Sequence, residues 1–406
     1  MKMKIKAPLQ PIRSAITLEG SKSISNRLLL MQALCTSGFE IRNLSPSDDT
    51  TTLQRLLKQQ PSISDVGAAG TTMRFLTAYY STLEGERMLT GSARMQQRPI
   101  GVLVEALEKL GADITYIEKK GYPPVRIKGK ELPGGTIRIR ADISSQYISA
   151  LMMIGPTLKK GLTLILDGKI ASAPYIQMTL STMQELGIDC KWEGATITIK
   201  NGSYRSVAMQ AESDWSAASY HYSICALSPG SHMRISGLFE KSLQGDSVLP
   251  DIYAKLGVTT FFEGKEMIIS NTGNCTSLLD QDYSDCPDIA QTVAVTCAAL
   301  GIPARFTGVE SLRIKETDRT AALQSELAKF NVTFEEREPG EWILSGKINP
   351  VEATISTYED HRMAMSFAPL ALVAPSITIE EPEVVKKSYP SFWYDMARLG
   401  FVLENI

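Results

Sequence analysis

The sequence predicts an α/β protein (α+β by some schemes) built from a repeated βαβαββ module. The first observation is a landmark in which a helix end is followed by Leu-Gly and then by a strand. It recurs at roughly 70 to 76 residues, the length of a small supersecondary module. A Gly or Asn just past a helix supplies the left-handed cap that ends it. The landmarks are Lys109-Leu110-Gly111, Glu185-Leu186-Gly187, Lys255-Leu256-Gly257, Arg398-Leu399-Gly400 and, in degenerate form, Lys329-Phe330-Asn331.

The second observation is that each module opens alike, with small or charged residues followed by an apolar helix. The openings are Ser21-Lys22-Ser23, Gly70-Thr71-Thr72, Ser144-Ser145-Gln146, Asp214-Trp215-Ser216, Pro287-Asp288-Ile289 and Asp360-His361-Arg362. A strand, a second helix and a strand pair follow, for example at 162–166, 174–186 and 189–199. We therefore expect six modules, and such repeats can direct several helix N-termini, with their positive potential, at one point.

A polar stretch at 201–214, with few apolar residues, is typical of a crossing between domains. We therefore divide the chain near residue 212 into two similar domains of three modules each. The lower domain is expected to cover 21–212, and the upper domain 1–20 together with 213–406. The first strand, from residue 5 to about 18, precedes the first opening and is assigned to the upper domain.

Composition excludes several classes of function. The formal net charge of −2 over 406 residues argues against bulk binding to nucleic acid or to an anionic membrane. No apolar run approaches the roughly 18 residues of a membrane span, and no signal peptide is expected, so we expect a cytoplasmic protein. The six cysteines lack zinc spacing and there are three histidines, which favours reduced thiols and no metal site.

The most informative cluster is Lys315-Glu316-Thr317-Asp318-Arg319, which precedes an apolar stripe at Leu323, Leu327 and Phe330. Lys315 and Arg319 continue this stripe backwards in steps of four, so the sequence predicts that the helix already includes both. Charges in line with a buried face are costly unless they are paired or wetted. A helix N-terminus with Lys and Arg suits an anion, and Glu316 is a candidate proton carrier.

Other charged clusters also lie at or near module openings. Lys22 and Arg27 surround serines in 20–27, but the Gly-x4-Gly-Lys-Ser spacing of a nucleotide loop is absent. Lys22, Asp288, Glu316 and Arg362 stand where the module geometry would bring them together. Several cations beside few carboxylates indicate a multiply anionic ligand, and Asp288 and Glu316 could divide the roles of base and acid.

Seven motifs in order make the chain resemble the 5-enolpyruvylshikimate-3-phosphate synthase family over essentially its whole length. The motifs are Gly20-Ser21-Lys22-Ser23-x-Ser25-x-Arg27, Ala69-Gly70-Thr71-Thr72-Met73-Arg74, Arg98-Pro99-Ile100, Ser144-Ser145-Gln146, Pro174-Tyr175-Ile176, Lys315-Glu316-Thr317-Asp318-Arg319 and Asp360-His361-Arg362-Met363-Ala364-Met365. The resemblance implies two similar domains, each of three βαβαββ units, that close over an active site in the interdomain cleft.

The resemblance also implies an activity. Members of the family transfer the carboxyvinyl group of phosphoenolpyruvate to the 5-hydroxyl of shikimate 3-phosphate and release phosphate, through a tetrahedral intermediate. This step belongs to the shikimate pathway, which leads through chorismate to the aromatic amino acids. No metal or organic cofactor is expected. The partners are the two small-molecule substrates, without nucleic acid or membrane, and a monomer is expected.

Residue roles are carried over only where this sequence matches the motifs. Lys22, Asp288 and Glu316 are the expected catalytic residues. Shikimate 3-phosphate is expected to contact Lys22, Ser23, Arg27, Ser144, Ser145, Gln146, Ser172, Tyr175, Asp288, Ser311 and Lys315. Phosphoenolpyruvate is expected to contact Lys22, Gly70, Arg98, Gln146, Arg319, Arg362 and Lys387. The division of acid and base roles between Asp288 and Glu316 is left open at this point.

Four positions depart from the pattern of the family. Ala68 stands where Asn is usual, which puts a hydrogen bond near the phosphoenolpyruvate site in doubt. Phe75 replaces a common Pro, and Ala173 replaces a frequent Lys. Ser311 stands where many members have Asn, although its hydroxyl could still contact the shikimate phosphate. None of these changes removes an expected proton-transfer residue.

Two alternatives remain. A sister enolpyruvyl transferase acts on UDP-N-acetylglucosamine and shares the fold and the donor. It typically has Cys where this chain has Ala93, and it lacks the 315–319 signature. The other alternative is a non-catalytic phospho-ligand binding protein on the same scaffold, for which two carboxylates facing anions would be unnecessary.

Overall fold

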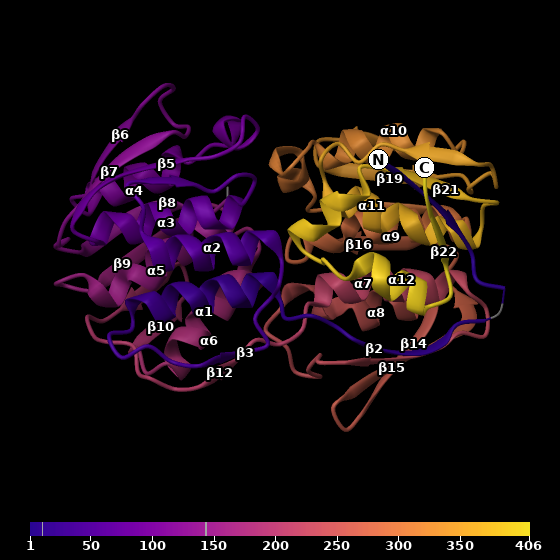
Figure 1. Cartoon of the computed structure of the whole chain (residues 1–406), viewed down its shortest axis with the longest axis horizontal. Coiled ribbons are helices and arrows are strands. Elements are labelled where there is room, and N and C mark those ends of the chain that lie inside the picture. The colour runs from indigo at the N-terminus through magenta and orange to yellow at the C-terminus, as the bar shows by residue number, and fades with distance from the viewer. Residues whose placement is uncertain (10, 143) are drawn as a thin grey trace. The chain divides into compact units, whose positions relative to one another are not determined.

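The computed structural model of the chain describes residues 1–9, 11–142 and 144–406. The chain forms two compact units (Figure 1). The first unit is Gly20–Ala211, and the second unit is Met1–Glu19 together with Glu212–Ile406. Each boundary lies one residue before the one expected from the sequence. Each unit is described by itself below.

Within the described ranges, one sheet topology recurs five times. A parallel pair of strands is followed in space by two antiparallel strands, and the third strand of the module in sequence takes the outer edge. In the first unit these sheets are β4 (Ile63–Asp65), β5 (Gly85–Thr90), β7 (Val125–Gly129), β6 (Asp113–Tyr116), and β8 (Gly135–Arg140), β9 (Leu162–Asp167), β11 (Thr196–Ile199), β10 (Cys190–Glu193). A short parallel pair, β3 (Ile41–Arg42) and β12 (Met209–Gln210), takes the place of the third sheet.

The second unit has three sheets of this kind. They are β2 (Arg13–Thr17), β13 (His232–Ser236), β15 (Glu266–Cys275), β14 (Leu256–Glu263); β16 (Leu279–Asp282), β17 (Ala304–Thr307), β19 (Glu341–Ser345), β18 (Thr333–Glu338); and β20 (Ala353–Ile355), β21 (Ile377–Glu380), β1 (Lys2–Lys6), β22 (Val402–Asn405). The last sheet is completed by the start of the chain, because β1 lies between β21 and β22.

The single first strand expected over about 5–18 is two strands, β1 and β2, in two different sheets of the second unit. Pro8 and Pro11 lie between them. Proline has no backbone N–H to donate to a sheet ladder, so a continuous strand through both prolines is disfavoured.

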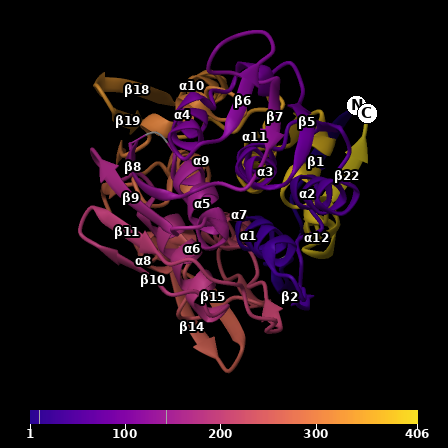
Figure 2. The same ribbon diagram turned by 90° about the vertical axis from the view of Figure 1, so that its left-hand side faces the viewer.

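The first helix of each module lies in the interior of its unit. Twelve of the thirteen residues of α7 are buried, and an apolar surface all round a helix requires burial on every side. Within the first unit α1, α3 and α5 pack against one another (Figure 2). Within the second unit α9 packs against both α7 and α11. These inner helices are α1 (Lys22–Leu34), α3 (Gly70–Thr82), α5 (Ser145–Ile154), α7 (Trp215–Leu227), α9 (Ala290–Leu300) and α11 (His361–Phe367).

The second helix of each module has one buried face. α10, for example, packs against β18, and Lys329 and Asn331 follow it, with Asn331 in the left-handed region at φ 61°. These outer helices are α2 (Asp48–Gln59), α4 (Gly101–Lys109), α6 (Ala173–Glu185), α8 (Leu249–Ala254), α10 (Arg319–Ala328) and α12 (Phe392–Arg398). None of the helices in the described ranges is both long enough and apolar enough to cross a membrane.

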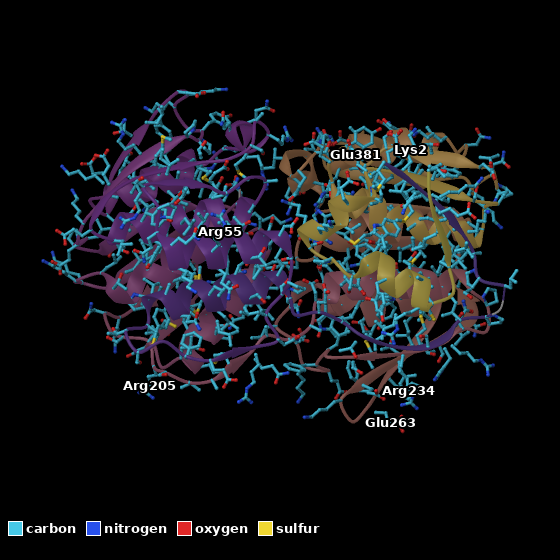
Figure 3. All side chains as sticks on the ribbon, in the orientation of Figure 1. Lys2, Arg55, Arg205, Arg234, Glu263 and Glu381 are labelled. Carbon is cyan, nitrogen blue, oxygen red and sulfur yellow. The ribbon has the colours of Figure 1, made fainter. Side chains whose placement is uncertain are left out.

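Charged pairs on the surface differ from those in the interior. Arg234 on β13 lies 3.0 Å from Glu263 on β14, and both side chains are exposed (Figure 3). Exposed pairs of this kind contribute little to stability because water and salt screen them. The charges at the ends of the inner helices are buried, and there the contacts have larger consequences.

Candidate active site

Three inner helices of the second unit begin around one guanidinium group. Arg362 stands in the first turn of α11, Ser216 in the first turn of α7, and Asp288 in the 3-10 turn Pro287–Ile289 that leads into α9. Nη2 of Arg362 lies 3.2 Å from Oδ2 of Asp288 and donates a hydrogen bond to Oγ of Ser216 at 3.3 Å. The expected meeting of module openings is therefore present within this unit for Asp288 and Arg362.

Arg319 is the first residue of α10 and binds three carboxylates. Its side chain is 2% exposed. Nε lies 2.8 Å from Asp360, Nη1 lies 2.9 Å from Asp288, and Nη2 lies 2.9 Å from Glu316. Burial lowers the pKa of the Arg319 guanidinium, but the three carboxylates raise it above its usual value, so the group stays charged.

The helix does not include Lys315, so the expected helical stripe through Lys315 and Arg319 is wrong. Asp318 caps the helix by accepting hydrogen bonds from the backbone N–H groups of Thr320 and Ala321, both at 3.1 Å. A residue that caps a helix adopts a non-helical conformation, so the residues before it lie outside the helix. Lys315 is extended, and its Nζ lies 3.4 Å from Asp288.

Asp288 is the carboxylate on which these cations meet. Burial alone would raise the pKa of Asp288, but Arg362, Lys315 and Arg319 together hold this pKa well below its usual range. Burial lowers the pKa of Lys315 despite the attraction of Asp288. Asp288 is thus an ionised acceptor that binds cations and has little basicity while they surround it.

Glu316 links Arg319 to a further cation. One carboxylate oxygen is 2.9 Å from Arg319, and the other is 3.8 Å from Nζ of Lys387, which ends the 3-10 helix Pro382–Lys387. Ser311 lies in the preceding 3-10 helix, Glu310–Ile314, and is half-buried. Glu316 therefore stands between two cations.

In the first unit, Arg27 is a buried cation whose hydrogen-bond acceptors are neutral oxygens. Its guanidinium donates to Oγ1 of Thr179 at 2.7 Å, Oγ of Ser149 at 3.1 Å, and the carbonyl oxygens of Ser23 at 2.8 Å and Tyr175 at 3.3 Å. Burial lowers the pKa of Arg27 to about 10. A buried charge that neutral groups alone solvate makes the surrounding region favourable for an anion.

Lys22 begins α1, and its Nζ lies 3.6 Å from the buried carboxylate of Asp49. Ser23 is the next residue and supplies one of the carbonyls that hold Arg27. Ser172 precedes α6 in the left-handed region at φ 54°. Within this unit, Lys22, Ser23 and Arg27 therefore share the first two turns of one helix.

The beginnings of α3 and α5 are joined by a side-chain contact. Gln146 Nε2 donates to Oγ1 of Thr71 at 3.2 Å, and Ser144 caps α5 by accepting from the Gln146 N–H at 3.3 Å. Ser145 is the first residue of α5 and is buried. The hydroxyl, amide and backbone groups at these helix beginnings suit an anionic oxygen.

Gly70 stands where the guanidinium of Arg98 passes close to the backbone. A Cβ at this position would lie 2.6 Å from Nη1 of Arg98 and 3.0 Å from Nη1 of Arg74. The Arg98 side chain is itself buried. A side chain at position 70 would therefore require this arginine to move.

Comparison with known proteins gives a consistent result. The model of the family described as EPSP synthase (3-phosphoshikimate 1-carboxyvinyltransferase) matches residues 6–60 and 53–396. The chain belongs to the EPSP synthase family.

Relatives with this name cover the whole chain. A 3-phosphoshikimate 1-carboxyvinyltransferase of Bacteroides fragilis (strain YCH46) is 47% identical over 409 residues, covering 100% of this chain and 99% of its own. One from Colwellia psychrerythraea is 36% identical over 422 residues, covering 97% and 98%. The solved structure of EPSP synthase from Acinetobacter baumannii is 21% identical, covers 100% of both chains and has a TM-score of 0.80, which shows the shared fold.

The four positions that depart from the EPSP synthase pattern lie at α3, at the start of α6 and in the segment that leads to Glu316. Phe75 is buried on α3, with its ring centroid 5.8 Å from the guanidinium carbon of Arg27, so here an aromatic face solvates the buried cation. Ala68 is exposed just before α3, and Ala173 is the first residue of α6. Ser311, described above, lies in the segment leading to Glu316.

Sequence reasoning missed several residues of the second-unit cluster. Asp360 was noted as part of a module opening and of the last family motif, without a role of its own, yet it binds Arg319 and also accepts from the backbone N–H of Arg362 at 2.9 Å. Tyr220 lies one turn into α7, and its hydroxyl accepts from Arg362 at 3.5 Å. Asp246 accepts a hydrogen bond from Ser216, which itself contacts Arg362. Its stretch of sequence is polar and shows no periodicity, so only the folded structure connects Asp246 to the cluster. The charge of the opening Asp360-His361-Arg362 was the signal that could have revealed Asp360.

Proposed function

We propose that this chain transfers the carboxyvinyl group of phosphoenolpyruvate to the 5-hydroxyl of shikimate 3-phosphate, giving 5-enolpyruvylshikimate 3-phosphate and phosphate. The observation that carries the proposal is Asp288, an ionised carboxylate in contact with Lys315, Arg319 and Arg362. Such a cluster places several cations where an anionic substrate can bind, next to Glu316 as the proposed acid and Asp288 as the proposed base. Membership of the EPSP synthase family supplies the substrates.

Phosphoenolpyruvate carries a carboxylate and a phosphate on three carbons, so it needs several cations. Arg319, Arg362 and Lys387 are the proposed contacts in the second unit. Asp288, Glu316 and Asp360 match these three positive charges, and Lys315, in contact with Asp288, adds a fourth. The remaining proposed contacts, in the first unit, are Lys22, Gly70, Arg98 and Gln146.

Shikimate 3-phosphate has a phosphate monoester, a carboxylate and hydroxyl groups. Arg27 supplies positive charge that neutral oxygens hold in the part of the chain that the structure describes. Serine hydroxyls and helix N-termini supply donors for the phosphate. The ring hydroxyls need acceptors, for which Asp288 is suited. The proposed contacts are Lys22, Ser23, Arg27, Ser144, Ser145, Gln146, Ser172, Tyr175, Asp288, Ser311 and Lys315.

The reaction needs one proton delivered to carbon and one removed from oxygen. Glu316 is the proposed donor to the C3 methylene, which leaves cationic character at C2. The 5-hydroxyl oxygen attacks C2 while its proton passes to Asp288, and the two substrates become one tetrahedral adduct. The adduct then loses a proton from the C3 methyl group and its C2–O bond to phosphate, so that the double bond is restored and phosphate leaves. Lys22 assists proton transfer and stabilises the leaving phosphate.

The charges around Asp288 explain why it would accept a proton only after the substrates have bound. The cations that lower the pKa of Asp288 are the proposed ligands of phosphoenolpyruvate and shikimate 3-phosphate. When substrate anions share Arg319, Arg362 and Lys315, the positive potential at Asp288 decreases and its basicity rises. The carboxylate therefore becomes a stronger base only after the substrates are bound.

The decisive experiment measures phosphate release by the purified chain. Release that requires both shikimate 3-phosphate and phosphoenolpyruvate is the expected result. Replacement of shikimate 3-phosphate by UDP-N-acetylglucosamine should abolish release, and continued release there would favour the sister transferase. Tight binding of both substrates without any phosphate or carboxyvinyl product would instead indicate a non-catalytic binding protein.

We further propose that the chain acts as a monomer in the cytoplasm, without a cofactor. Light scattering coupled to size-exclusion chromatography should give a mass near 44.5 kDa. A mass of twice that value, unchanged on dilution, would contradict the monomer.

A further inference from the structure

Asp246 is a buried carboxylate for which the steps described so far give no role. It lies in the 3-10 turn Gly245–Val248 of the second unit and is 1% exposed. The Ser216 hydroxyl donates a hydrogen bond to Oδ2 of Asp246. Among the described residues, the other oxygen, Oδ1, has no hydrogen-bond partner.

Ser216 connects this carboxylate to the cluster. Its oxygen accepts a hydrogen bond from Nη2 of Arg362 at 3.3 Å, while its proton is donated to Asp246. Hydrogen bonds in such a chain polarise one another, so a negative charge on Asp246 makes Ser216 a better acceptor for Arg362. Asp246 therefore reaches Nη2 of Arg362 through Ser216, and the same nitrogen lies 3.2 Å from Asp288.

Asp246 is surrounded by polar and charged groups from α7, from α11 and from the segment that leads into α9. Burial raises its pKa to about 7, Asp288 adds to the rise, and Arg362 and the Ser216 hydroxyl oppose it. Asp214, the N-cap of α7, also raises it, and the Cys286 thiol lies close enough for Asp246 to raise the pKa of that thiol. A carboxyl group in this setting changes its charge near neutral pH.

We propose that Asp246, acting through the Ser216 hydroxyl, is a positioning residue for Arg362 and takes up a proton when the anionic donor substrate binds that arginine. The inference rests on the proposed function, in which Arg362 binds phosphoenolpyruvate. The substrate anion competes for the positive charge that stabilises ionised Asp246, so the ionised carboxylate becomes less stable in the complex. Protonation removes the repulsion and leaves the hydrogen-bonded geometry in place.

The sign of the pH dependence follows from this competition. Binding that raises the pKa of Asp246 is coupled to proton uptake, so the affinity for phosphoenolpyruvate falls as pH rises through and above 7. A shift of one pKa unit on binding corresponds to a change of about tenfold in affinity between low and high pH. The phosphate of the substrate also titrates, with a second pKa near 6, so the effect of Asp246 must be isolated by comparison with a variant.

The test compares Asp246→Asn and Ser216→Ala with the unchanged chain between pH 6 and 8.5. Asparagine keeps an acceptor for Ser216 but cannot titrate, so the rise of KM for phosphoenolpyruvate toward pH 8.5 should be about tenfold smaller than in the unchanged chain. Ser216→Ala should raise this KM several-fold and reduce its rise toward pH 8.5, because the link between Asp246 and Arg362 is lost. In both variants KM for shikimate 3-phosphate should stay within about twofold, which also reports correct folding. Asp251→Asn, an exposed carboxylate on α8, is the matched control and should change neither constant.

A second measurement uses the unchanged chain alone. Calorimetric titration with phosphoenolpyruvate alone, so that no turnover occurs, at pH 8 in buffers of different ionisation enthalpy, should show uptake on the order of half a proton per site. The phosphate is almost fully ionised at this pH, so the proton must enter the protein. Absence of uptake, or a KM profile in Asp246→Asn that matches the unchanged chain, would overturn the proposal while turnover persists. Loss of all turnover in the unchanged chain would instead contradict the proposed function.

Discussion

The guanidinium of Arg319 lies 2.8 Å from the carboxylate of Asp360, and both side chains are almost completely buried. Asp360 also caps α11 through the backbone N–H of Arg362. One carboxylate therefore connects the first residue of α10 to the start of α11. The position of both arginines depends on this contact.

Replacing Asp360 with Ala should lower the free energy of unfolding by about 3 kcal/mol, because it leaves a buried guanidinium with one partner fewer. Removal of one partner of a buried ion pair typically costs about 3–5 kcal/mol, and we expect the lower value because Asp288 and Glu316 still bind Arg319. Urea denaturation followed by tryptophan fluorescence measures the change. Asp318→Ala, which removes only the cap of α10, should cost about 1 kcal/mol. Equal losses in the two variants would show that the buried pair adds nothing beyond capping.

Replacing Glu316 with Gln should lower kcat by roughly two to four orders of magnitude, the usual contribution of a general acid or base. Glutamine keeps the shape and an acceptor for Arg319, so the dissociation constants of both substrates should change little. Stopped-flow measurement of phosphate release gives kcat, and calorimetry gives binding. Glu310→Gln, at a nearby exposed glutamate, serves as the control. Unchanged turnover in Glu316→Gln would remove this residue from the mechanism.

Asp288 should contribute stability that depends on pH. Its pKa is well below the usual range in the folded chain, so the ionised group stabilises the fold above its unfolded pKa, about 3.9. This contribution is lost as pH falls from about 4 through the lower native pKa. The difference in unfolding free energy between the unchanged chain and Asp288→Asn should therefore shrink as pH falls below 4. A difference that instead grows on acidification would contradict the lowered pKa.

The module pattern was readable from the sequence because it depends on local signals. Each expected opening lies at the start of an inner helix, as at Gly70 and Trp215, and each Leu-Gly landmark follows an outer helix. Small or capping residues before an apolar run, and Gly after it, act within one helical turn. Such signals need no knowledge of tertiary contacts.

The site was predictable only in part, because a buried side chain pairs with residues that are distant in the sequence. Arg319 was expected to bind an anion, but its contacts with Asp360 and Asp288 join residues 41 and 31 positions away. The helix start was misplaced at Lys315 because apolar spacing could be continued backwards, whereas the Asp318 cap stopped it. Asp246 gave no pattern at all, since its environment is created by α7 and α11.

Replacing Gly70 with Ala should weaken phosphoenolpyruvate binding while leaving the fold nearly intact. The new Cβ would lie 2.6 Å from Nη1 of Arg98, which is the flexible end of a side chain, so the guanidinium must shift and the backbone need not. KM for phosphoenolpyruvate should rise about tenfold or more, in keeping with the loss of one charge-assisted hydrogen bond, about 1.5–3 kcal/mol. KM for shikimate 3-phosphate and the melting temperature should change little. Gly202→Ala, where an added Cβ meets nothing within 4 Å, is the matched control. Equal increases in both KM values for Gly70→Ala would show that the substitution disturbs the whole first unit, and would remove the specific link between Gly70, Arg98 and the donor substrate.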